Sequence, residues 1–273
     1  MKNRIPAFFQ LERFNIQPAD IIRLALGCEP TDIQASVILM PNWRAEIFGV
    51  HIDQLDAITP GRLYQVKYKD QPISVIRCGI GAPLAGDTVL ALGYTPCQQL
   101  IFAGSVGGLD PAMQVGDLFL ANRSLSGDGY SRYLNAQVIP PDVYLQPVEP
   151  DAQLTSLVAS VAADLSRQKE TPFHRGTVIS IDTILGQFLR LPHYVQELGC
   201  AGIEMETAAV FRAAQLVEIQ ACALLQVSDV IPLNKTLFTG RTAEDMARRR
   251  AIRADLLAPI ILESIDQNQR GDT

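Results

Sequence analysis

Residues 73–92 read ISVIRCGIGAPLAGDTVLAL, and this stretch decides the fold class. The run ISVIR (73–77) is typical of a strand covered on both faces, because its apolar residues are nearly continuous instead of alternating. Glycines follow, and Pro83 opens a helical stretch that stops at Gly93. A second apolar run, QLIFA (99–103), comes next. The order strand, helix, strand predicts a mostly parallel or mixed sheet with helices on both sides.

The same alternation continues in both directions along the chain. Further predicted strands are SVILM (36–40), DLFLA (117–121), TVISI (177–181) and ACALLQV (221–227). Further predicted helices span 151–167, 204–216 and 242–266. The last one begins with an approximate capping box, Thr242-x-x-Asp245, and Pro259 should kink it. Residues 124–150 are rich in Gly, Pro, Asp and Ser, so they predict a long loop with a short strand at most.

Composition limits the class of protein. A chain of 273 residues with 48% hydrophobic and 19% charged residues is long enough for one large α/β domain. A net charge of -6 argues against a nucleic-acid duplex or an anionic membrane as the main partner. The five cysteines are scattered without a C-x-x-C pair, so neither a disulfide framework nor a zinc site is expected. Without a signal-like start or an apolar stretch of roughly 20 residues, we expect a cytoplasmic protein.

Two glycine-rich segments follow predicted strands, where open α/β sheets place ligands. In GIGAP (79–83) the backbone amides can approach a ligand, although such a segment is more often a tight strand-to-helix turn. In AGSVGGL (103–109), Ser105 and neighbouring amides suit an anion or a sugar hydroxyl, and the alternative is a bulged strand exit. Both segments are therefore candidate parts of one pocket.

A third segment, GIEMETAA (202–209), supplies carboxylates at positions 204 and 206. One carboxylate can accept hydrogen bonds from sugar hydroxyls while Met205 packs on the apolar face of the sugar. Asp229, at the end of the next strand, is a candidate proton donor if its pocket raises its pKa. The structural alternatives are a Glu pair at a helix N-terminus and an Asp that caps a turn.

Taken together, GIGAP, AGSVGGLDPAMQVGD, GIEMETAAVFRAA and LLQVSDV resemble the nucleoside phosphorylase family, over roughly residues 35 to 265. This family contains uridine phosphorylases, hexameric purine nucleoside phosphorylases and related hydrolytic nucleosidases. The resemblance implies one α/β domain with a central mixed sheet partly closed into a barrel and flanked by helices. It also implies a homodimer, or a hexamer built as a trimer of dimers, with active sites near subunit interfaces. No metal or organic cofactor is implied; phosphate is the co-substrate.

The resemblance also assigns roles to site residues. Met205 and Glu206 should hold the ribose together with Ser105, and Ile203 should lie against the base. Ser228 and Asp229 should face the base, with Asp229 and Glu206 as the catalytic pair. In purine-specific relatives the acid at this place protonates or hydrogen-bonds N7 of the leaving purine, and uridine phosphorylases lack it. A purine (deoxy)ribonucleoside, cleaved to free base and (deoxy)ribose 1-phosphate, is therefore the expected substrate.

Residues 180–190 resemble the base-site stretch of the family. Ile184 stands where an aromatic residue usually stacks on the base. Gln187 and Arg190 resemble the pair with which uridine phosphorylases read uracil, although here they are three residues apart instead of two. A uridine phosphorylase-like specificity therefore remains an alternative.

The phosphate site departs most from the family pattern. Arg44 and Ser105 match phosphate-binding positions, and Arg62 is the candidate for an arginine supplied by a partner subunit. Phe102 occupies the place of a further arginine, and replacing a guanidinium by a phenyl ring removes a bidentate phosphate contact. Arg241 resembles an arginine that pairs with the acid at 229.

Two other functions stay open on this evidence. A hydrolytic nucleosidase is favoured by Phe102 and opposed by the lack of an early water-activating Glu. A non-catalytic nucleoside-binding relative is opposed by the retention of both Glu206 and Asp229. Within the chain, we expect residues 1–34 to form an extension that packs on the domain or on a partner subunit. Residues 35–268 should form the catalytic domain.

Overall fold

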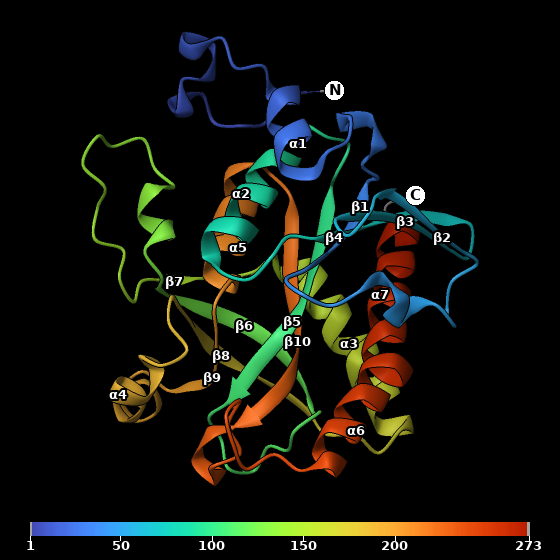
Figure 1. Cartoon of the computed structure of the whole chain (residues 1–273), viewed down its shortest axis with the longest axis vertical. Coiled ribbons are helices and arrows are strands. Elements are labelled where there is room, and N and C mark those ends of the chain that lie inside the picture. Colours follow the sequence, from blue (N-terminus) through green and yellow to red (C-terminus); the bar gives the residue numbers. More distant parts are fainter. Residues whose placement is uncertain (1, 272–273) are drawn as a thin grey trace.

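The computed structural model describes residues 2–271 and contains one mixed sheet with helices on both sides (Figure 1). The strands are β1 (Ser36–Met40), β2 (Gln54–Thr59), β3 (Leu63–Tyr68), β4 (Gln71–Arg77), β5 (Gln99–Gly108), β6 (Leu118–Gly127), β7 (Pro147–Val148), β8 (Phe173–Ile181), β9 (Cys200–Glu204) and β10 (Gln220–Val230). The helices are α1 (Pro18–Leu26), α2 (Ala82–Leu92), α3 (Ala152–Gln168), α4 (Gln187–Pro192), α5 (Thr207–Leu216), α6 (Ala243–Ile252) and α7 (Ala258–Gly271).

Part of the sheet closes on itself. The strand order is β10-β6-β8-β9-β5-β1-β4-β3-β2, and β10 also pairs with β5, so the first five strands form a closed barrel. Strands β1, β4, β3 and β2 continue from β5 as an open sheet. Strand β5 therefore belongs to both parts and pairs with β1, β9 and β10. This confirms the expected single α/β domain with a mixed sheet partly closed into a barrel.

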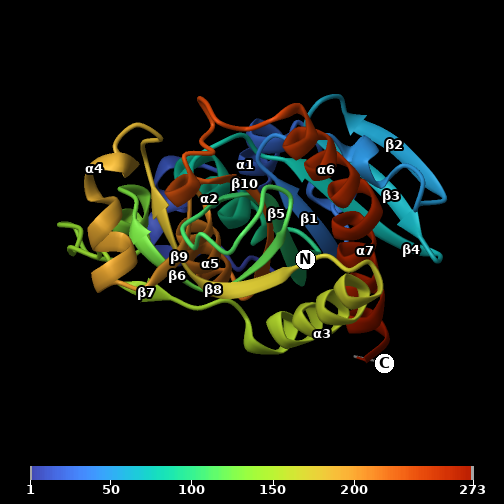
Figure 2. The same ribbon diagram turned by 90° about the horizontal axis from the view of Figure 1, so that it is seen from below.

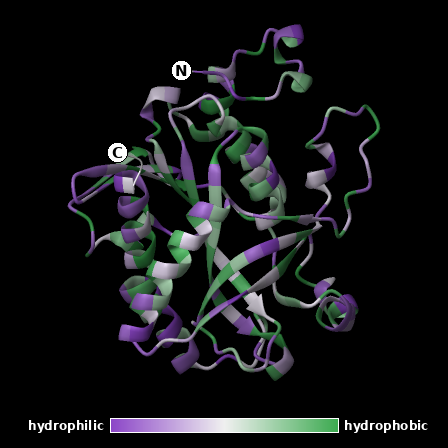
Figure 3. Cartoon of the chain, turned by 180° about the vertical axis from the view of Figure 1, so that it is seen from behind, coloured by the Kyte–Doolittle hydropathy of each residue, from purple (hydrophilic) through white to green (hydrophobic). Residues whose placement is uncertain are grey.

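Two helical layers cover the sheet. Helices α1, α2 and α5 share one apolar cluster with the strands, which includes Phe211 of α5 and Phe102 of β5. Helices α3 and α7 pack against each other over a second cluster on the other side, which includes Ile261. In both views α4 and β2 lie at opposite ends of the molecule (Figures 1 and 2). Hydrophobic and hydrophilic segments alternate along α3 and α7, as expected of helices with one buried face (Figure 3).

The C-terminal helix begins as predicted. Thr242 accepts a hydrogen bond from the Asp245 amide, and the Asp245 carboxylate accepts one from the Thr242 amide, which confirms the capping box. The helix is interrupted by a π-helical segment at Arg253–Leu257, immediately before Pro259. A proline has no N–H and collides with the preceding turn, so the interruption lies where Pro259 was expected to act.

Several predicted boundaries were wrong. The glycine-rich residues 104–108 are not an exit from the strand, because β5 continues through them to Gly108. The helix expected from residue 204 begins at Thr207, since Glu204 still belongs to β9. The loop predicted for residues 124–150 begins only after Gly127, because β6 extends to that residue. Strands β2, β3 and β9 were missed; β2 is largely exposed and β9 is short, so neither gives a clear apolar run.

The N-terminal residues pack on the rest of the chain. Helix α1 lies against α2, and the Arg4 guanidinium donates to the Cys97 carbonyl oxygen at 2.6 Å. The short helical turns at Ala7–Phe9 and Leu11–Phe14, which precede α1 in the chain, lie at the edge of the molecule (Figure 1). Within residues 2–271, no helix is long and apolar enough to cross a membrane.

Candidate active site

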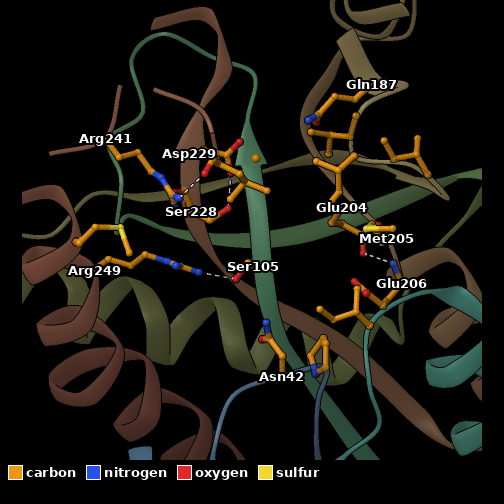
Figure 4. A pocket seen from close by; sticks show the side chains of 18 residues that line it. Asn42, Ser105, Gln187, Glu204, Met205, Glu206, Ser228, Asp229, Arg241 and Arg249 are labelled. Carbon is orange, nitrogen blue, oxygen red and sulfur yellow. Dashed lines mark hydrogen bonds between the residues drawn. The ribbon is translucent and has the colours of Figure 1, made fainter. Parts of the chain in front are cut away.

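A pocket of about 370 Å³ opens beside the ends of β5 and β10 (Figure 4). Its size lies in the range of small-molecule sites. The residues assigned from sequence that line it are Ser105, Ile184, Gln187, Ile203, Met205, Glu206, Ser228 and Asp229. The structure therefore brings residues from distant parts of the chain to one cavity.

Strand register explains how the two acidic segments meet. Asp229 of β10 pairs with Gly107 of β5, and Gly107 pairs on its other side with Ile203 of β9. Because β9 runs antiparallel to β5, Glu204 and the residues after it approach the pocket from the opposite direction to Asp229. A Cβ atom at Gly107 would lie 3.0 Å from Ile203 and 3.4 Å from the Asp229 carboxylate. The absent side chain therefore keeps the space between the two walls open.

Asp229 forms one wall of the pocket. It is 2% exposed, and its carboxylate accepts a hydrogen bond from the Ser228 hydroxyl. Burial raises its pKa, while the Ser228 hydrogen bond and the positive charges of Arg241 and Arg249 oppose the rise. A carboxyl whose pKa is raised in this way is suited to hold a proton and give it to a bound molecule. Arg241 donates to the Ser228 carbonyl oxygen at 3.2 Å, so its guanidinium lies beside this acid.

The opposite wall carries Glu204 and Glu206, whose carboxyls have different hydrogen-bond partners. Glu204 accepts hydrogen bonds from the amides of Glu206 and Thr207, each at 2.7 Å, and from the hydroxyls of Ser180 and Thr207. It therefore fixes the start of α5 and the Met205 turn. Glu206 instead receives one hydrogen bond from the Gly81 amide at 2.7 Å. The GIGAP turn thus touches the pocket by holding this carboxyl.

Glu206 is 5% exposed, and its surroundings favour its neutral form. Burial and the nearby charge of Glu204 raise the pKa of Glu206 to about 8, against the Gly81 hydrogen bond. A neutral carboxyl can donate one hydrogen bond and accept others, whereas a carboxylate only accepts. The Gly81 amide uses only part of the hydrogen-bonding capacity of Glu206, which also lines the cavity. Glu206 can therefore bind a pair of vicinal hydroxyls.

The sequence did not indicate a second arginine in the pocket lining. Arg249 of α6 lines the cavity, and its Nη2 donates to the Ser105 hydroxyl at 2.7 Å. The position of α6 is fixed by its neighbour Arg248, which pairs with the buried Asp117 at 2.6 Å. The sequence signal was three consecutive arginines at 248–250 in an acidic chain. Such a run normally indicates a solvated helix face, and only Arg250 of the three is exposed.

The remaining predicted residues lie elsewhere. Arg190 is outside the pocket lining and donates to the Tyr144 hydroxyl at 2.9 Å. Arg44 is exposed and does not line the pocket. Arg62 donates to the Ala25 carbonyl oxygen at 2.9 Å, near the N-terminal segment and away from the pocket of its own chain. Phe102 is buried in the apolar core on the side of α2 and α5.

The pocket lining combines acidic, basic, hydroxyl and amide side chains. Among residues 2–271, no group of three or more His, Cys, Asp or Glu side chains could hold a metal ion. The polar groups of the pocket are two arginines, the three carboxyls of Glu204, Glu206 and Asp229, and hydroxyl and amide side chains. This set can grip hydroxyls, supply a proton and neutralise an anion.

The comparisons with known proteins point to one family. The model of the phosphorylase superfamily matches residues 38–261, which is most of the chain. The chain is 27% identical over 213 residues to a purine nucleoside phosphorylase of the DeoD type from Mycoplasma genitalium, covering 74% of this chain and 85% of the relative. It is 26% identical over 215 residues to a uridine phosphorylase from Thermococcus kodakarensis, covering 72% and 73%.

A solved structure has the same fold. The crystal structure of uridine phosphorylase from Vibrio fischeri superposes with a TM-score of 0.71 at 20% identity, covering 86% of this chain and 93% of that one. At this identity the likeness concerns the fold alone. The curated relatives include both a purine and a pyrimidine phosphorylase, so similarity by itself does not choose the base.

Proposed function

Because this chain belongs to the phosphorylase superfamily, we propose that it cleaves the N-glycosidic bond of a purine nucleoside by phosphorolysis. The products are the free base and (deoxy)ribose 1-phosphate. The observation that carries the proposal is the position of Asp229, a buried acid with a raised pKa in the same pocket as Met205 and Glu206.

The chemistry follows from charge. As the bond between C1' and the base nitrogen breaks, the base takes the electron pair and the sugar becomes electron-poor. Asp229 gives its proton to the leaving base, which removes the developing negative charge. A phosphate oxygen bonds to C1' and completes the sugar 1-phosphate. The proton on Asp229 is then restored from solvent.

The other pocket residues orient the substrate. Glu206 binds the 2' and 3' hydroxyls, and Met205 packs on the sugar. Ile184, Ile203 and Ser228 face the base. Holding the sugar and the acid in one geometry lowers the entropic part of the barrier. These assignments rest on the pocket lining and on the hydrogen bond that points Glu206 inward from Gly81.

Hydrolysis on the same scaffold is the second candidate function. The observation in its favour is that neither Arg44 nor Arg62 lines the pocket, while Phe102 is buried in the core. Water would then attack C1' and release free ribose. Gln187, which does line the pocket, keeps a uracil-type base as an alternative substrate.

We also propose that the chain works as a homodimer or a hexamer. Arg62 lies away from the pocket of its own chain, so its predicted phosphate contact needs a second copy. Size measurement of the purified protein, together with phosphate kinetics of Arg62→Ala, tests this. A monomeric enzyme with unchanged phosphate kinetics in that variant would exclude it.

The decisive assay compares base release from inosine, adenosine and uridine with and without inorganic phosphate. We expect purine release that depends on phosphate and yields sugar 1-phosphate. Equal rates without phosphate, with free ribose as product, would replace phosphorolysis by hydrolysis. Preference for uridine would exclude the purine assignment, and binding without any turnover would make the chain a nucleoside-binding protein.

A further inference from the structure

Arg249 is a half-buried cation with an unbonded Nε at the Ser105 end of the pocket. Its side chain extends from α6 toward β5, and its Nη2 contacts the Ser105 hydroxyl (Figure 4). Its Nε is buried without a hydrogen-bond partner, and within residues 2–271 it forms no ion pair. A guanidinium removed from water is costly unless an anion or several acceptors surround it. The buried Nε of Arg249 therefore lacks the acceptor that its burial requires.

Its neighbours on the same segment have partners of their own. Arg248 pairs with Asp117, and Arg253 stacks on the Trp43 ring at 4.3 Å and donates to Gln226. Arg250 is exposed to solvent. Arg249 alone of these four arginines combines a place in the pocket lining with a buried, unbonded donor. The arrangement is specific to this position and does not reflect a generally basic helix.

A purely structural role as counter-ion to Asp229 fits less well. The positive charge of Arg249 acts on Asp229, but in the described residues no hydrogen bond or ion pair joins the two. Asp229 is bonded by Ser228, and the Arg249 guanidinium points to Ser105 instead (Figure 4). The Arg249 guanidinium and the Ser105 hydroxyl therefore lie against each other in the lining of one pocket.

We infer that Arg249 and Ser105 bind the free phosphate that attacks the sugar, with Arg249 supplying the guanidinium that position 102 lacks. This inference rests on the proposed phosphorolysis. Guanidinium and hydroxyl donors match phosphate oxygens, and arginine does so through two parallel N–H groups. The backbone of α6 is held for this purpose by Gln226, whose amide donates to the Arg249 carbonyl oxygen at 2.9 Å.

The test uses the full chain with Arg249→Gln, Arg249→Lys and the control Arg250→Gln, which alters the adjacent exposed arginine. The Michaelis constant for phosphate, the Michaelis constant for the nucleoside, and the direct binding of inorganic phosphate by calorimetry are measured. Loss of a charged hydrogen-bonding group should weaken phosphate about 10- to 100-fold in Arg249→Gln. Arg249→Lys keeps the charge but loses the paired N–H donors of the guanidinium, so its phosphate affinity should lie between those of the native chain and Arg249→Gln. The nucleoside constant should change less than about threefold.

The outcomes separate this inference from the proposed function. Phosphate-dependent turnover with an unchanged phosphate constant in Arg249→Gln would overturn the inference and leave phosphorolysis intact. If turnover needs no phosphate but calorimetry shows phosphate bound by the native chain and lost in Arg249→Gln, phosphorolysis fails and the anion site stands. Absence of phosphate binding in the native chain overturns the inference. Equal loss in Arg250→Gln also overturns it.

Discussion

The two sides of the pocket are built in different ways. The sugar and base side consists of Met205, Glu206 and Asp229, which strand register in the barrel brings together through Gly107. The anion side consists of Ser105 on β5 and Arg249, which a helix from the C-terminal region delivers. Side chains fixed by neighbouring strands follow from short motifs, whereas a cation carried on a helix depends on how that helix docks. The difference predicts that the two sides can be damaged separately.

The largest expected effect breaks the sugar and base side alone. Asp229→Asn keeps the shape of the side chain but removes the proton donor, so kcat should fall about 100- to 10,000-fold. Phosphate binding measured by calorimetry should persist. Asp266→Asn, which changes another buried acid on α7, serves as control and should keep kcat. A loss of less than tenfold in Asp229→Asn would show that the acid does not take part in the chemistry.

The next change loosens the anion side. Asp117 is fully buried and accepts hydrogen bonds from Arg248 and from His174 at 2.8 Å. Asp117→Ala removes the carboxylate that the half-buried Arg248 guanidinium and the His174 ring both contact, so the free energy of unfolding should drop by about 3 kcal/mol, measured by urea denaturation. Phosphate binding should weaken more than nucleoside binding, because α6 carries Arg249.

The matched control for that change is Asp164→Ala. Asp164 forms an exposed ion pair with Arg167 on α3, and such pairs contribute little. Equal stability losses in the two variants would contradict the anchoring role of Asp117.

A third prediction concerns pH and sharpens the description of the sugar side. Burial and the charge of Glu204 raise the pKa of Glu206 from its ordinary value of 4.5 to about 8 in the folded protein. Between these two values the folded state holds a proton that the unfolded state has lost, so stability falls as pH rises through this window. Glu206→Gln removes this titration. Between pH 5 and pH 8 the native chain should therefore lose on the order of 2 kcal/mol more of its free energy of unfolding than the variant does.

Thermal unfolding of both proteins across this pH range provides the measurement. If the stability of the native chain falls no more than that of the variant, Glu206 is not held as a buried, neutral carboxyl. Nucleoside turnover should be reduced in Glu206→Gln, because an amide nitrogen only donates, whereas the O–H of a neutral carboxyl can both donate and accept.

The smallest expected effect tests how Glu206 is held. Gly81 has a φ of +106°, which other residues rarely adopt, and a Cβ there would meet nothing closer than 3.8 Å. Gly81→Ala should therefore cost about 1 kcal/mol through backbone strain alone. Gly61→Ala is the matched control, because Gly61 also has a positive φ, of +79°, and open space around it. Both variants should lose similar stability, but only Gly81→Ala should raise the Michaelis constant for the nucleoside.

The sequence predicted the fold class and most of the sugar and base side. Apolar runs longer than a few residues became strands β1, β5, β8 and β10, since buried parallel strands need continuous apolar side chains. Exposed or short strands such as β2 and β9 lack this pattern, and their place depends on pairing partners far away in the chain.

The anion side shows where sequence reasoning ends. Ser105 was assigned from its glycine-rich surroundings, but the partner of Ser105 was sought at Arg44 and Arg62, which do not line the pocket. Arg249 carries no motif, and its direction depends on the Asp117 anchor and on the docking of α6. Periodicity indicates which face of a helix packs on the core, but it does not identify a cation that points into a pocket.

Strand β5 belongs to both the barrel and the open sheet, and this has a consequence for the order of folding. Closure of the barrel requires β10 to pair with β5 from Gln99 to Gly108, although β10 begins only at Gln220. Contacts between such distant parts of a chain form slowly, and a chain growing on the ribosome cannot form them until its last quarter has emerged. The open sheet of β1 to β4 can assemble earlier. Shortened chains should therefore hold an ordered first half and an unclosed barrel, with aggregation as the expected fate.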